Sequence, residues 1–187
     1  MDNKLNILNY LAKHHAENYT LHQLSIILKI PYATLYRTIQ DMSDLIVMQV
    51  KGKAKLVSIN WNDTAPAHLA VASYEENKEF LANHIIIKKI AENSSPITLL
   101  FGSYAKGTQR KDSDVDLLII TKTGKTNTSF ATQEILFRKK INPIVVTEKE
   151  FKDMLKEKEE NVGKQALKDH IILNGFDKFW RLVYDTR

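Results

Sequence analysis

The side chains best suited to chemistry in this chain lie between residues 99 and 119. An apolar run ends there in Gly102-Ser103, and after a polar loop Asp114 and Asp116 alternate at the start of a second apolar run. A Gly-Ser turn can hold a phosphate on its backbone amides. Carboxylates two residues apart on a strand point to the same side. Two hard oxygen ligands beside a phosphate cradle predict a site for Mg²⁺ carrying a nucleoside triphosphate.

The elements that must position these side chains follow from apolar patterning and turn residues. A continuous apolar run predicts a buried strand at 97–101 and another at 115–120, with a short helix at 104–107 between them. Farther along the chain we expect a helix at 129–140 with Phe130, Ile135 and Leu136 facing inward, a strand at 144–146, and helices at 149–158, 164–173 and 176–184.

This order, together with Gly102-Ser103 and Asp114-Val115-Asp116, resembles the nucleotidyltransferase superfamily that includes DNA polymerase beta. The resemblance covers about residues 80–160 and is greatest to the minimal nucleotidyltransferases of archaea and bacteria. It implies an α/β (α+β) nucleotidyltransferase fold with a small mixed sheet. By the same resemblance, Gly102 and Ser103 hold the triphosphate, and Asp114 and Asp116 are the catalytic ligands of Mg²⁺ or Mn²⁺. Two cations of the intervening loop, those of Lys106 and Arg110, are expected to help with the phosphate charge.

One position departs from the family pattern. Members with the full catalytic apparatus carry a third carboxylate on the third strand, where this chain has Asn142 near the expected place. Asparagine can coordinate a metal ion through its carbonyl oxygen, but it is neutral and cannot act as a base. Pro143 predicts that the strand begins there and lies at the edge of the sheet. Glu148 starts the next helix and is a poor substitute.

The first sixty residues show a different pattern, with helix signals near 3–16, after Thr20 and after Pro31, then strands at 45–50 and 55–59. Three helices and a hairpin with lysines at its tip resemble a winged helix-turn-helix domain, mostly α, over residues 3–60. That resemblance implies DNA binding, with base edges read by Tyr32, Thr34, Tyr36 and Arg37 and phosphates contacted by Lys51, Lys53 and Lys55. A helix-turn-helix used for dimerisation or for holding the other domain, with solvated lysines and half-buried tyrosines, fits the same pattern.

The composition shifts predict three segments: a winged helix-turn-helix domain at 1–62, a linker and connecting helix at 63–94, and the nucleotidyltransferase domain with C-terminal helices at 95–187. We expect the connecting helix to run from about residue 67 to 92, with a break near Tyr74-Glu75. Its Ile85-Ile86-Ile87 run predicts burial on two sides, against both domains or a second subunit. We therefore favour a homodimer.

Composition narrows the functional classes further. The 187 residues are 43% hydrophobic, carry a net charge of +5 and include no cysteine. These values permit a packed core and nucleic-acid binding, and they exclude disulfides and thiolate metal sites. Residues 1–62 hold 7 Lys/Arg against 4 Asp/Glu, so the first third is the more basic part. With no signal-peptide pattern and no apolar run of roughly 20 residues, we expect a soluble, cytoplasmic protein without membrane contact.

Two hypotheses follow. In the first, the protein transfers a nucleoside monophosphate from ATP or another NTP to a hydroxyl of a protein, a nucleic-acid end or a small molecule. Some minimal nucleotidyltransferases act as antitoxins that modify a toxin, so a protein acceptor or toxin partner is one possibility. In the second, the protein is a DNA-binding regulator whose nucleotidyltransferase domain binds nucleotide or a partner without turnover.

Overall fold

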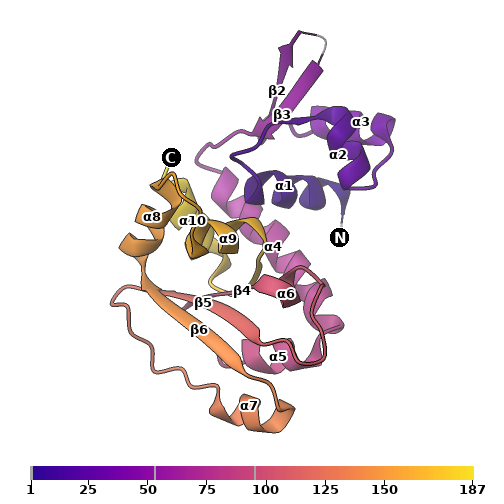
Figure 1. Ribbon diagram of the computed structural model, residues 1–187. Coiled ribbons are helices and arrows are strands. Elements are labelled where there is room, and N and C mark those ends of the chain that lie inside the picture. The colour runs from indigo at the N-terminus through magenta and orange to yellow at the C-terminus, as the bar shows by residue number, and fades with distance from the viewer. Residues whose placement is uncertain (1, 53, 95) are drawn as a thin grey trace. The chain divides into compact units, whose positions relative to one another are not determined.

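The computed structural model describes residues 2–52, 54–94 and 96–187. The chain forms two compact units, Met1–Glu75 and Glu76–Arg187, and the division falls within helix α4 (Ala65–Ala82) (Figure 1). Within the described ranges, no helix combines the length and the apolar character needed to cross a bilayer.

The first unit consists of short helices and a small antiparallel sheet. Its elements are α1 (Asn3–Lys13), β1 (Tyr19–Thr20), α2 (Leu21–Ile27), α3 (Tyr32–Gln40), β2 (Ile46–Lys51) and β3 (Ala54–Ile59). The strands are ordered β1-β3-β2, so β3 is central. Helix α2 begins after Thr20, as the sequence predicts, and Thr20 and Gln23 form a capping box there. Leu8, Leu24 and Leu35 are almost completely buried and hold the three helices together.

The second unit is built on a four-stranded mixed sheet. Its elements are α5 (Ile85–Ala91), β4 (Ile97–Phe101), α6 (Gly102–Ala105), β5 (Val115–Thr121), α7 (Ala131–Phe137), β6 (Ile141–Thr147), α8 (Glu148–Lys156), α9 (Val162–Lys168), β7 (Ile171–Asn174) and α10 (Phe176–Tyr184). The strand order is β6-β5-β4-β7, with β5 and β6 parallel and the other pairs antiparallel. The expected α+β fold with a small mixed sheet is therefore confirmed.

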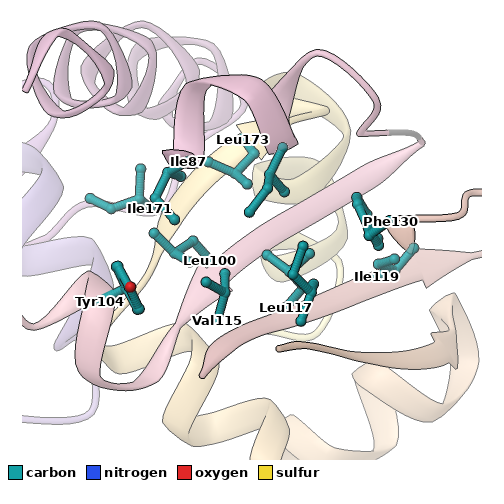
Figure 2. Packing of buried hydrophobic residues seen from close by; sticks show 11 residues of the cluster. Ile87, Leu100, Tyr104, Val115, Leu117, Ile119, Phe130, Ile171 and Leu173 are labelled. Atoms are coloured by element: carbon teal, nitrogen blue, oxygen red, sulfur yellow. The ribbon is translucent and has the colours of Figure 1, made fainter. Parts of the chain in front are cut away.

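Helices cover both faces of this sheet, which explains why its central strands are apolar throughout. Successive side chains of a strand point to opposite faces, so Val115, Leu117 and Ile119 share one face. They pack there with Leu100 of β4 and with residues of α5 and α6, as Figure 2 shows. Helices α8, α9 and α10 pack on the other face, where Trp180 is completely buried (Figure 1). The predicted strands at 97–101 and 115–120 are confirmed.

The expected helix at 164–173 is wrong in its second half. Helix α9 ends at Lys168, and Ile171–Asn174 form strand β7, which pairs with β4. The apolar run Ile171-Ile172-Leu173 fits either structure by pattern alone. Pairing with β4 decides for the strand, because the run is buried there and its backbone groups that face β4 gain hydrogen-bond partners.

One further expectation of burial is wrong, and a second, burial of the isoleucine run against a second subunit, stays a prediction. Phe130 is buried as predicted, but Ile135 and Leu136 on α7 are 80% and 66% exposed, because Gln133 occupies the buried position of this two-turn helix. Ile85 is 62% exposed whereas Ile87 is completely buried, so the isoleucine run is not covered on both sides within the unit.

The break in the long helix also differs from the prediction, since α4 ends at Ala82 and α5 begins at Ile85. Asn83 and His84 direct their side chains at the carbonyl oxygens of Glu79 and Phe80, at 3.2 and 2.8 Å. Side chains that bond to the backbone of the preceding turn compete with helix continuation. The helix therefore ends there and not at Tyr74-Glu75.

Strand β6 lies at the sheet edge, as Pro143 predicts, although it begins two residues earlier at Ile141. The Val115 amide donates to the Lys140 carbonyl, so the even-numbered residues of β6 turn their backbone toward β5 and the odd ones turn outward. The Ile141 amide donates to Glu134 at 2.8 Å, and the Thr147 amide donates to Glu150 at 2.7 Å. Pro143 has no amide hydrogen. These features protect the edge from pairing with another strand.

Candidate active site

The two predicted aspartates lie at the beginning of β5, on the face of the sheet that α8, α9 and α10 cover. Asp114 directly precedes the strand and Asp116 is its second residue. Val115, between them, is completely buried on the opposite face. Burial of Val115 therefore fixes the strand register that turns both carboxylates toward the same side, where Asp114 keeps 41% of its side chain exposed.

The turn after β4 meets Asp116 at very short range. Phe101, the last residue of β4, is paired with Asp116 in the antiparallel register. Gly102 follows with φ +70°, and a Cβ atom built on it would lie 2.5 Å from the Asp116 Oδ2 atom. Glycine suits this position best, because L-residues disfavour that backbone conformation and any side chain would have to displace the carboxylate. The structure thus brings Asp116 against the bare backbone of Gly102, with Ser103 as the next residue.

Asn142 completes the cluster from the neighbouring strand. It is paired with Asp116 in the parallel β5–β6 register. Its side-chain Nδ2 donates to Asp114 Oδ2 at 3.1 Å and to Asp116 Oδ1 at 3.3 Å. Asn142 therefore bridges the two aspartates.

Two lysines that the sequence reasoning missed reach the same place. Lys140 Nζ lies 3.9 Å from Asp114 Oδ2, but both side chains are substantially exposed, so the attraction is weak. Lys139 Nζ donates to the backbone carbonyls of Lys111 and Ser113 and lies 5.9 Å from the centre of the Tyr104 ring. Lys139 thereby stabilises the loop that precedes Asp114. The available signal was their position, directly before the strand that carries Asn142.

The two loop residues expected near the phosphates, Lys106 and Arg110, make contacts with residues other than the two predicted aspartates. Lys106 Nζ is 3.3 Å from Asp169 Oδ2, beyond the end of α9. The exposed Arg110 takes part in a turn, in which its amide donates to Ser113 Oγ at 2.8 Å and its carbonyl accepts from the Ser113 amide at 3.1 Å. In the described part of the chain, Lys106 thus contacts Asp169 and Arg110 contacts Ser113.

The donor set fits a magnesium ion that arrives with phosphates. Among the described residues, no group of three or more His, Cys, Asp or Glu side chains is arranged to hold a metal ion. Mg²⁺ is commonly held by one or two carboxylates, with substrate phosphates and water completing its octahedral shell. Asp114, Asp116 and the carbonyl oxygen of Asn142 suit such an open site. They do not suit a closed site made only of protein ligands.

The second predicted site lies on α3 and the hairpin of the first unit. Tyr32 is 49% exposed and Arg37 is exposed, with its Nε atom 3.3 Å from the Ala33 carbonyl. Lys55 Nζ lies 3.4 Å from the Tyr36 hydroxyl and 4.6 Å from the centre of its ring. The hairpin lysine therefore fastens β3 to α3, and Tyr36 is half-buried.

The remaining residues of that prediction occupy exposed, half-buried and undescribed positions. Lys51, at the end of β2, is exposed, and Thr34 is half-buried. Lys53 lies outside the described residues. In the first unit, the predicted DNA-contacting residues of α3 are therefore exposed or half-buried, and Lys51 of the hairpin is exposed.

Comparison with known proteins gives a match to a family model. No curated protein and no solved structure matches the chain. Residues 85–174 match the family model described as Nucleotidyltransferase domain. The matched segment runs from the start of α5 to the end of β7, so it contains the whole mixed sheet, Gly102, both aspartates and Asn142. Residues 85–174 therefore carry the pattern of a nucleotidyltransferase domain, and the α+β fold of the second unit agrees with it.

Proposed function

We propose that the second unit transfers a nucleoside monophosphate from an NTP to an acceptor hydroxyl and requires Mg²⁺ or Mn²⁺. One observation carries this proposal. The Asp116 carboxylate lies against the backbone of Gly102, so that a cation on Asp114 and Asp116 and a triphosphate on the Gly102-Ser103 turn would be direct neighbours. The match of residues 85–174 to the nucleotidyltransferase domain family supports it.

Each residue has a distinct part in the proposed reaction. Asp114 and Asp116 hold the cation, and the amides of Gly102 and Ser103 bind phosphate oxygens. The bound cation would neutralise phosphate charge and align the α-phosphorus for in-line attack. The acceptor oxygen forms a bond to that phosphorus, and the bond to the departing pyrophosphate breaks. Asn142 cannot take up the acceptor's proton, so solvent or a group on the acceptor receives it.

The first unit supplies a proposed second activity, that of a winged helix-turn-helix domain that binds DNA. Support comes from the order of its elements, with three helices followed by the β2–β3 hairpin, and from the exposed Tyr32, Arg37 and Lys51. The contact of Lys55 with Tyr36 would fix the hairpin relative to α3 before DNA is bound. The two activities can be coupled in a homodimer that regulates its target.

A second candidate function is favoured by Asn142. Without a carboxylate on β6, the domain lacks a base for the acceptor hydroxyl. In that case the protein is a regulator or an antitoxin-like protein, whose second unit binds nucleotide or a protein partner without turnover.

Nucleotide transfer is tested with each α-³²P-labelled NTP, Mg²⁺ or Mn²⁺, and a cell extract as the source of acceptors. We expect labelled product with the parent chain. Asp114→Asn or Asp116→Asn should lower the rate on the order of 100-fold or more, because a cation ligand is lost. Absence of transfer, with the variants indistinguishable from the parent, would contradict the enzymatic proposal and favour the regulator.

Gly102→Ala tests the close contact between the turn and Asp116. The new methyl group would displace the carboxylate, so we expect loss of Mn²⁺-dependent nucleotide binding in calorimetry. Gly107→Ala is the matched control, because Gly107 also has a positive φ, +67°, but no atom lies within 4 Å of its added Cβ. Both variants should lose about 1–2 kcal/mol of stability from the left-handed backbone. If both bind nucleotide equally well, the contact is not part of the site.

DNA binding is measured by fluorescence anisotropy with duplex DNA over a range of salt concentrations. We expect affinity to fall steeply with salt, and Lys51→Ala to reduce the slope of log K against log salt by about one, because one phosphate contact is lost. Lys122→Ala, which removes an exposed lysine of the second unit, should leave the slope unchanged. Binding that survives replacement of Arg37, Lys51 and Lys55 together would refute the assignment.

A further inference from the structure

The side-chain amide of Asn142 is held in a fixed place between two negative charges. The backbone of Asn142 is turned toward β5 in the parallel register, and its Cα is paired with that of Asp116. From this position Nδ2 reaches one oxygen of each aspartate, at 3.1 and 3.3 Å. An amide NH₂ group carries two hydrogens, so it can donate one to each carboxylate.

This arrangement changes the electrostatics of the cluster when no cation is bound. Two neighbouring carboxylates repel each other, and a third at position 142 would add to the repulsion. Hydrogen bonds to ionised acceptors are stronger than those between neutral groups. Asn142 therefore replaces a repulsive neighbour with an attractive one, and the aspartate pair stays assembled without a metal ion.

The same substitution lowers the negative charge available for cations. Asp114 and Asp116 supply two carboxylates, and the ammonium group of Lys140 lies 3.9 Å from Asp114. Rotation of the Asn142 amide about its Cβ–Cγ bond would present its carbonyl oxygen in place of the NH₂ group. Neutral oxygen ligands can complete the shell of one hard cation, but they add nothing to the charge that would offset a second.

We infer that Asn142 is a positioning residue that keeps the aspartate pair preassembled when empty and limits the site to one divalent cation per bound nucleotide. The inference rests on the proposed nucleotide site. It deepens that proposal, because it assigns the site a cation stoichiometry and assigns Asn142 two alternating roles, as donor to the carboxylates and as ligand to the cation.

The stoichiometry is measured by titrating the full chain with Mn²⁺ in the presence of a non-hydrolysable NTP analogue, with free Mn²⁺ followed by electron paramagnetic resonance. We expect one bound Mn²⁺ per parent chain and two per Asn142→Asp chain. Asn127→Asp is the matched control, because it adds the same charge at an exposed position beside a separate polar cavity at the other end of β5. This control should bind one ion.

Preassembly is measured independently, by thermal unfolding in EDTA and in Mn²⁺ with the analogue. Asn142→Ala removes the bridging amide without adding charge, so in EDTA it should unfold about 4 °C or more below the parent. Asn142→Asp should unfold lower still, and Mn²⁺ with the analogue should recover most of its loss. The Asn127→Asp control should follow the parent in both solutions.

The outcomes separate this inference from the proposed function. Two Mn²⁺ ions on the parent chain, or one on Asn142→Asp, would overturn the inference and leave the nucleotide site intact. Equal unfolding temperatures of the parent and Asn142→Ala in EDTA would overturn preassembly. An absence of Mn²⁺ and nucleotide binding by the parent would overturn the inference and the proposed function together.

Discussion

The close approach of the Asp116 carboxylate to the Gly102 backbone is the constraint on which the candidate site depends. It exists because Phe101 pairs with Asp116 across β4 and β5 and because Gly102 then turns with a positive φ. The register of these strands is held by the packing of apolar side chains on both faces of the sheet, and a slip of one residue would turn the Asp116 carboxylate toward the face where Val115 is buried. Packing of the sheet thus determines where the charges lie.

Charge balance determines what this geometry can do. The two aspartates are held together by the amide of Asn142 and lie near the exposed ammonium of Lys140, and Lys139 ties down the loop before them. Each of these contacts favours a site that is ready to receive a cation and polyphosphate. None of them supplies a base for an acceptor hydroxyl. The arrangement therefore supports nucleotide binding more directly than it supports rapid transfer, and in the proposed reaction the acceptor's proton passes to solvent or to a group on the acceptor.

Local patterns predicted much of this structure, and the failures occurred where distant segments meet. The strand at 97–101 and the helix at 176–184 agree residue for residue, because continuous burial or clear helical spacing defines them. The second half of 164–173 became β7 because β4 was available to pair with it. Asn142 bridges the two aspartates, and Lys139 donates hydrogen bonds to the loop before Asp114. Both contacts depend on the parallel β5–β6 register, which cannot be predicted from the sequence patterns.

A crystal structure of the chain with Mn²⁺ and a non-hydrolysable NTP analogue, with the manganese located by anomalous scattering, tests the central claim most directly. The account predicts a manganese peak between the carboxylates of Asp114 and Asp116, with the triphosphate lying along the Gly102-Ser103 turn. A triphosphate bound elsewhere on the chain, or a manganese ion that does not contact either aspartate, would contradict it.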